Sequence, residues 1–73
     1  MVPFAQVLEY LERHDWVLYR IHKPYRVFYK HGTPATGLPI LVEVNAGGTV
    51  DEEHFEKIRR IVERDAAGSN GET

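Results

Sequence analysis

The sequence predicts an α+β domain of order α-β-β-β-α, in which two helices pack on one face of a three-stranded antiparallel sheet. Two observations predict this class. Apolar residues recur with helical spacing near both ends of the chain, whereas the middle alternates with a period of two. Turns containing Gly or Pro separate the alternating segments. At 73 residues the chain forms a single domain, expected at residues 1–64, and residues 65–73 are expected to be a disordered tail with nothing to bury.

The first helix is predicted over residues 3–13. Pro3 suits its first turn, because a helix has no use there for the N–H that proline lacks. The side chains that follow the i, i+3, i+4, i+7 spacing of one buried helix face are Phe4, Val7, Leu8 and Leu11. This face should cover the sheet.

Two strands are predicted next, over residues 16–22 and 25–30, joined by a turn at Lys23-Pro24 into an antiparallel hairpin. Strict alternation would place Trp16, Leu18 and Arg20 on one face of the first strand, and Val17, Tyr19 and Ile21 on the other. The pattern leaves open which face meets the helices.

The third strand is predicted over residues 38–45, followed by a second helix. The expected core face of the strand consists of Leu38, Ile40, Val42 and Val44. The helix is expected to open either at Thr49, with Glu52 completing a capping box, or directly at Asp51. Its expected buried stripe consists of Phe55, Ile58, Ile61 and Val62.

The middle of the chain differs from the rest in charge. Residues 16–42 contain four Lys or Arg and no Asp or Glu, in a chain whose net charge is −2. The first half of this segment is also rich in aromatic residues. A basic and aromatic segment predicts contact with an anionic partner. The alternative is structural, since sheets favour aromatic residues and exposed Lys or Arg protect strand edges.

Several classes of site find no support in the composition. The chain has no cysteine, which excludes a disulfide and a thiolate zinc site, and its four His lack ligand-like spacing, so neither metal nor cofactor is expected. It has no glycine-rich phosphate loop and no nucleophile paired with a base. With no apolar run of membrane length and no signal pattern, we expect a soluble cytoplasmic domain.

The order and spacing of the segments WVLYR, YRVFYKHG, ILVEV and EKIRRIV resemble the HicA family of small toxins, also called YcfA-like proteins. The resemblance covers roughly residues 4–63. It implies a fold like that of double-stranded-RNA-binding domains. It also implies a metal-independent endoribonuclease that cuts messenger RNA and is silenced by a HicB-like antitoxin protein.

The family signature is Gly-Ser-His at the hairpin turn. Alignment on Trp16 and Phe28 puts this signature onto Lys23-Pro24-Tyr25, so all three positions differ, and the position of the catalytic His holds Tyr25. The family's Gly before the Trp falls on Asp15. The resemblance therefore implies an RNA-directed protein that is either a divergent nuclease or an RNA binder without catalytic activity.

Two residues are the catalytic candidates, Tyr25 by its position and His22 by its chemistry. RNA cleavage without a metal needs a base for the 2′-OH proton and an acid for the leaving oxygen, and His suits both tasks at neutral pH. Tyrosine, with an ordinary pKa of about 10, is a poor base. His22 lies on the other side of the turn and is the alternative base, although a lone hairpin His is more often solvated and idle.

Two functions remain open. In the first, the chain binds RNA through Arg20, Lys23, Arg26, Tyr29, Lys30 and His31, with Tyr25 or Tyr29 stacking on bases. Single-stranded RNA is favoured over a duplex, because the last helix opens with Asp51-Glu52-Glu53, which repels phosphates. In the second, the hairpin is a protein-interaction module that docks on an acidic surface, such as that of a HicB-like protein.

Overall fold

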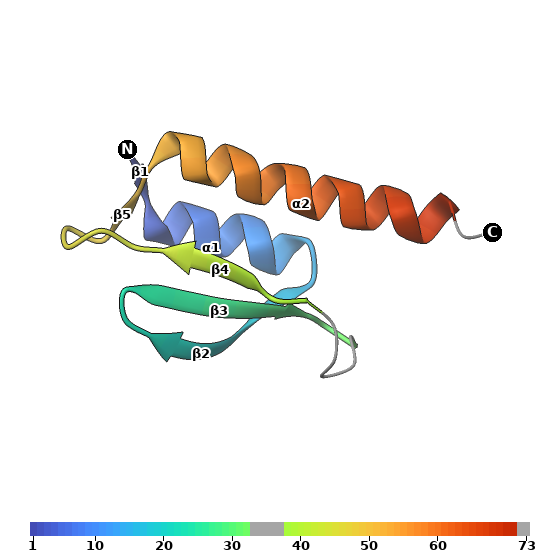
Figure 1. The fold of residues 1–73 in the computed structure, drawn as a ribbon, viewed down its shortest axis with the longest axis horizontal. Coiled ribbons are helices and arrows are strands. Elements are labelled where there is room, and N and C mark those ends of the chain that lie inside the picture. The colour runs from blue at the N-terminus through green and yellow to red at the C-terminus, as the bar shows by residue number, and fades with distance from the viewer. Residues whose placement is uncertain (33–37, 72–73) are drawn as a thin grey trace.

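The computed structural model describes residues 1–32 and 38–71, the last five as backbone only, and confirms the predicted α+β class. Its main elements are α1 (Phe4–Arg13), β2 (Trp16–His22), β3 (Tyr25–Lys30), β4 (Ile40–Glu43) and α2 (Glu52–Gly71). The three strands form an antiparallel sheet of order β2-β3-β4, and both helices lie on one side of it (Figure 1). A second sheet, absent from the prediction, pairs β1 (Val2–Pro3) with β5 (Thr49–Val50).

One hydrophobic core fills the space between the helices and the sheet. The buried side chains are Val7, Leu11, Trp16, Phe28, Ile40, Val42, Val44, Val50, Ile58 and Val62. Val7 and Leu11 in α1, like Ile58 and Val62 in α2, are four residues apart and so share one face of their helix. Phe28 has no exposed surface and lies on β3, the central strand, which places it at the middle of this core.

Two residues predicted in the core are exposed instead. Leu38 is 87% exposed because β4 begins only at Ile40, after Pro39, which has no N–H to donate to a strand. Ile61 is 46% exposed. Helix α2 contacts the sheet along its edge strand β4, and one narrow stripe of α2 side chains is sufficient for that contact.

Strand β2 does not alternate strictly. Leu18 lies opposite Phe28, but Arg20 lies opposite Val27, the next residue along β3, so Tyr19 is an extra residue in a β-bulge. The bulge turns Arg20 to the sheet face that points away from the helices. The predicted grouping of Arg20 with the inward-facing Leu18 is therefore wrong, and the rest of β2 changes faces with it.

Helix α2 begins at the second of the two predicted positions. Thr49 belongs to β5, whereas Glu52 is the first helical residue and Asp51 precedes it. The backbone N–H of Phe55 donates to the Asp51 carbonyl at 2.9 Å, as expected for the first helical bond. At this end of α2, His54 covers the edge of the main sheet, because its Nε2 accepts the backbone N–H of Glu43 at 3.0 Å.

The C-terminal end of α2 extends further than the sequence predicts. The structure continues the helix to Gly71, through most of the tail expected to be disordered, and residues 72–73 lie outside the described part. Lys30 of β3 donates to Asp65 of α2 at 2.7 Å, which ties the helix to the sheet at that point. Extending an existing helix costs far less than nucleating one. Short polar residues can therefore remain helical beyond the core.

Asp15 ends α1 in the left-handed region, with φ at 69°. Its N–H donates to the Glu12 carbonyl at 3.1 Å, and its own carbonyl accepts from the N–H of His31, so the conformation is held from both sides. Glycine adopts this region without steric cost, whereas other residues lose about 1 kcal/mol. We expect Asp15→Gly to raise the free energy of unfolding by about 0.5 kcal/mol, and Asp15→Val to lower it. Urea titration measures both, and a less stable glycine variant would contradict the expectation.

Candidate nucleic-acid interface

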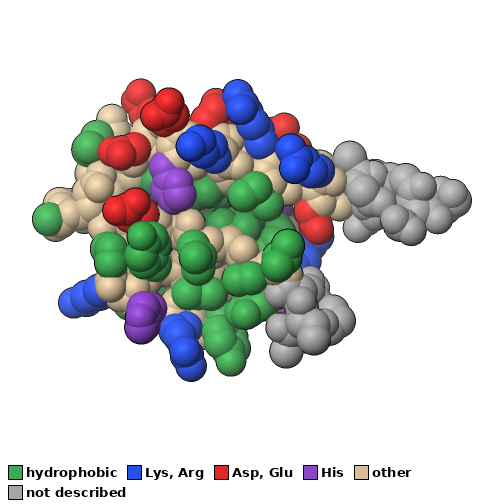
Figure 2. All heavy atoms as spheres, in the orientation of Figure 1, with side chains coloured by type: hydrophobic (Ala, Val, Ile, Leu, Met, Phe, Trp, Pro, Cys, Tyr) green, Lys and Arg blue, Asp and Glu red, His purple; other side chains and the backbone are tan. Residues whose placement is uncertain are grey.

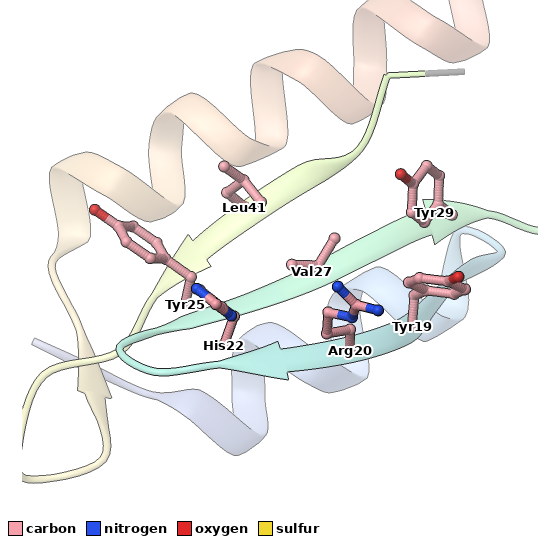
Figure 3. Close-up of a pocket in the computed structure, with 7 residues that line it drawn as sticks. All are labelled: Tyr19, Arg20, His22, Tyr25, Val27, Tyr29 and Leu41. Atoms are coloured by element: carbon pink, nitrogen blue, oxygen red, sulfur yellow. The ribbon is translucent and has the colours of Figure 1, made fainter. Parts of the chain in front are cut away.

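The sheet face that points away from the helices carries an open hollow of about 300 Å³. All three strands contribute to it, as Figure 3 shows. The lining residues are Tyr19, Arg20, His22, Tyr25, Val27, Tyr29 and Leu41. None of them is acidic. The neighbouring Glu43, opposite Tyr25 in the pairing of β3 with β4, adds one carboxylate at the border.

Two tyrosines from neighbouring strands form one aromatic platform in this hollow. The rings of Tyr19 and Tyr29 meet edge to face, with centroids 5.1 Å apart and planes at 83°. The guanidinium carbon of Arg20 lies 5.9 Å from the Tyr19 ring centroid. Tyr19 remains 67% exposed, so its ring is open to solvent. The bulge makes this arrangement, because it puts Tyr19 and Arg20 on the same face.

His22 and Tyr25 lie opposite each other across the β2–β3 hairpin, next to its turn. Both side chains point to the exposed face (Figure 3). Directly opposed residues of antiparallel strands have Cβ atoms about 4.5–5.5 Å apart, within reach of aromatic side chains. The structure thus brings together the two residues predicted as catalytic candidates, at one end of the hollow.

The predicted RNA-binding residues divide between the two faces of the sheet. Arg20 and Tyr29 line the hollow together with the catalytic candidates. Arg26 and Lys30 project to the opposite face of β3, the face that bears the helices. There the Arg26 guanidinium lies 5.5 Å from the Phe4 ring centroid, and Lys30 pairs with Asp65.

The remaining two predicted RNA-binding residues, Lys23 and His31, lie at opposite ends of the hairpin. Lys23 is exposed in the turn, where its peptide bond to Pro24 is cis. His31 follows β3 at the other end and is also exposed. No single surface therefore holds all of the predicted residues. The largest group on one surface is the one around the hollow.

Sequence reasoning missed Tyr19, Val27 and Leu41 as residues of this surface. Strict alternation separated Tyr19 from Arg20, and nothing in the residue pattern indicates a bulge at that point. Val27 and Leu41 are opposed residues of β3 and β4. Their place at the hollow could have been found only by knowing which face the helices cover.

Tyr10 behaves differently from the tyrosines of the hollow. Its ring packs edge to face on Phe55 of α2, with centroids 5.6 Å apart. Burial, followed by the nearby Glu63 carboxylate, raises the pKa of Tyr10 above its ordinary value, because both disfavour the phenolate. This tyrosine therefore belongs to the packing between the helices.

Within residues 1–32 and 38–71, no group of three or more His, Asp or Glu is placed to hold a metal ion. No helix in this part of the chain is both long and apolar enough to cross a bilayer.

Comparison with protein-family models, curated proteins and solved structures gives no match to this chain. The resemblance to HicA toxins accordingly stays an expectation from the order and spacing of segments.

Proposed function

We propose that this protein binds single-stranded RNA on the exposed face of its sheet. The observation that carries the proposal is that Tyr19, Tyr25 and Tyr29 share with Arg20 and His22 the sheet face opposite α1 and α2. Stacking of a base on an aromatic side chain contributes about 1–3 kcal/mol. Arg20 supplies a charge for the phosphates between stacked bases.

Single-stranded RNA suits this surface better than a duplex. Stacking on a tyrosine ring needs an unstacked base, which loops and single strands offer and a paired helix does not. The start of α2, which would have to approach the phosphates of a duplex, is acidic at Asp51, Glu52 and Glu53. Like charge there disfavours duplex binding.

Within this function we place the chain in the lineage of HicA-like messenger-RNA interferases, as a member with impaired cleavage. The resemblance in segment order supports this, as does the left-handed conformation of Asp15 at the family's glycine position. The hairpin turn lacks the family's His and holds Tyr25 opposite His22 instead. A HicB-like protein that covers the same face is the partner this lineage would imply.

The test is binding of a fluorescently labelled, unstructured RNA, followed by anisotropy at several salt concentrations. We expect Arg20→Gln to weaken binding several-fold and to lower the slope of log affinity against log salt by about one. Tyr29→Ala should weaken binding by a further factor of about 5–100, the equivalent of one lost stack. Arg13→Gln is the matched control, because Arg13 lies at the end of α1 and pairs with Glu9. Equal binding by all variants would contradict the proposal.

A protein-interaction module is the second candidate, favoured by the apolar character of the same face. Hydrophobic side chains gather over the sheet in Figure 2, whereas acidic ones gather along α2. Val17 and Leu41 are 50% and 49% exposed. Contiguous exposed apolar surface often marks a protein interface. Salt separates the two functions, since a protein partner would show a shallower dependence than RNA.

A further inference from the structure

We propose a second phosphate-binding site at the turn end of the hairpin, which makes a bound RNA strand pass around the β2–β3 turn. The site is a notch of about 440 Å³ that contains Lys23 and Arg26. It lies beyond the hollow and shares no lining residue with it. The inference rests on the proposed function and deepens it, because it sets the length of RNA that the protein binds.

Both walls of the notch are held by backbone hydrogen bonds. On one side the Pro24 carbonyl accepts the N–H of Val44 at 2.9 Å, which fastens the hairpin turn to the chain after β4. On the other, the N–H of Gly48 donates to the Asn45 carbonyl at 2.8 Å and closes the loop at 45–48. Gly48 has φ at 80°, where a side chain would be strained. A site formed in advance loses less entropy when a ligand binds.

Arg26 carries a charge that no carboxylate neutralises within the described part of the chain. The ion pairs of that part join other basic groups to acids, among them Lys30 with Asp65 at 2.7 Å. Arg26 instead lies over the Phe4 ring, 5.5 Å from its centroid. An arginine placed on a ring face keeps its N–H groups for a phosphate, which it can hold with two hydrogen bonds.

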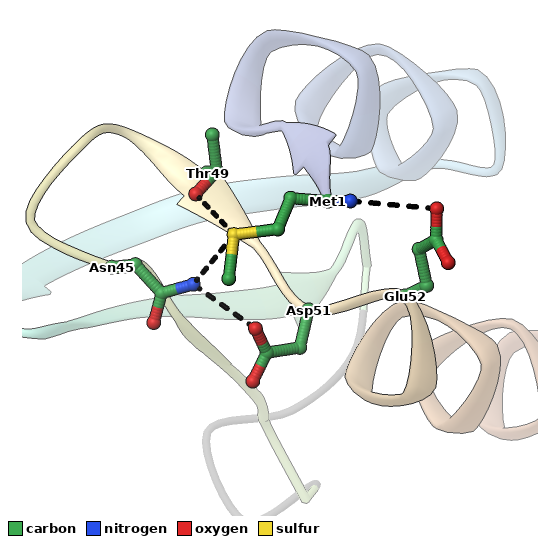
Figure 4. Close-up of polar contacts among 5 residues, drawn as sticks. All are labelled: Met1, Asn45, Thr49, Asp51 and Glu52. Carbon is green, nitrogen blue, oxygen red and sulfur yellow. Dashed lines mark hydrogen bonds and ion pairs between the residues drawn. The ribbon is translucent and has the colours of Figure 1, made fainter.

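Two acidic side chains near the loop at 45–48, Asp51 and Glu52, contact groups of this chain, as Figure 4 shows. Asp51 Oδ1 accepts from Asn45 Nδ2 at 3.2 Å, so the neutral amide of Asn45, not the carboxylate, lines the notch. Glu52 Oε2 lies 3.4 Å from the amino group of Met1. Among the described residues that line the notch, two are basic and none is acidic. The notch therefore fits an anion.

The pleat of β3 connects the notch to the hollow. Tyr25 faces the hollow and the next residue, Arg26, faces the notch, because successive side chains of a strand point to opposite faces. Lys23, in the turn that precedes Tyr25, also lines the notch. An RNA strand that stacks one base on Tyr25 meets Lys23 and then Arg26 as it leaves the β-sheet.

The experiment compares two lengths of single-stranded RNA, of about four and about twelve nucleotides, within the range used by small single-strand-binding domains. In a variant combining Lys23→Gln and Arg26→Gln, we expect the short RNA to bind as it does to the unaltered protein. The long RNA should lose roughly tenfold in affinity at low salt, and its salt slope should fall by about two. Lys30→Gln is the control, a lysine of the same strand whose charge Asp65 already neutralises. Circular dichroism verifies that each variant is folded.

The outcomes separate this inference from the proposed function. If the double variant keeps full affinity for the long RNA, or loses affinity equally for both lengths, the separate notch site is wrong while the sheet face remains a binding surface. If the unaltered protein binds neither length, the proposed function fails and the inference fails with it. A loss confined to the long RNA supports both.

Discussion

Tyr25→His is expected to raise the rate of RNA cleavage by about 10²–10⁴-fold, the usual contribution of a positioned acid or base. The introduced imidazole would stand opposite His22 across the hairpin, on the exposed face. Two facing imidazoles supply one proton acceptor and one proton donor near neutral pH, whereas a phenol is a poor acceptor and a weaker donor than an imidazolium.

The expected chemistry is transesterification without a metal. One imidazole removes the 2′-OH proton, the 2′ oxygen bonds to phosphorus, and the bond from phosphorus to the 5′ oxygen breaks. The other imidazole gives its proton to that leaving oxygen. The products are a 2′,3′-cyclic phosphate and a free 5′-OH. Cleavage should be greatest at a pH where one imidazole is neutral and the other protonated, giving a bell-shaped profile.

A quenched fluorescent RNA measures this cleavage, and a strand with a single 2′-deoxy position shows whether the 2′-OH attacks. Tyr25→Phe is the matched control, because it keeps the ring for stacking and offers no group to titrate. Adding His22→Ala to the Tyr25→His variant should abolish the gain. A cleavage rate unchanged from that of the native chain, in a variant that still binds RNA, would show that the two side chains do not reach the scissile phosphate together.

Phe28→Ala is expected to lower the free energy of unfolding by about 3–5 kcal/mol. Phe28 has no exposed surface, lies on the central strand and packs near the Phe4 ring, with centroids 6.5 Å apart. Its removal leaves a cavity that the sheet cannot close without breaking its pairing on both sides. Because small domains are only marginally stable, we expect this variant to be largely unfolded at 25 °C.

Denaturant titration followed by circular dichroism measures the effect. Val27→Ala is the control, since Val27 is the neighbouring residue of β3 and faces the open hollow instead of the core. Its truncation should cost less than about 1 kcal/mol, and it introduces the same alanine into the same strand. If both variants lose a similar free energy of unfolding, the two faces of β3 do not differ in packing, and the structure described above is contradicted.

Both sites depend on the folded sheet. The notch takes Arg26 from β3 and Val44 from the buried core, and the hollow needs all three strands in register. Loss of core packing should therefore abolish both sites together. For that reason the binding experiments have to be made with variants whose unfolding curves match that of the native chain.

Much of the fold can be predicted from residue spacing. The helical spacing in α1 and the pair Ile58 and Val62 in α2 identify faces that the structure buries. The turn at Lys23-Pro24 joins two strands, as its residue types indicate. The small sheet of β1 and β5 has no comparable signal, because each of its strands is only two residues long.

The candidate site could be predicted only in part. Its basic and aromatic residues are visible as a segment without acids, and the resemblance to HicA toxins draws attention to Tyr25 and His22. Their grouping is not visible, because a strand sends neighbouring residues to opposite faces and one extra residue reverses the order. The bulge at Tyr19 is such a residue.

The sequence by itself determined the fold class, the central hairpin and the separation of charge along the chain. Only the tertiary structure decided that Arg20 joins the tyrosines on the exposed face, that Lys30 is neutralised by Asp65 and that Arg26 lies at a separate notch. The physical reason is that both faces of β3 carry aromatic side chains, Tyr25 and Tyr29 on one and Phe28 on the other. They become different only when the helices cover one of them and leave the other to solvent.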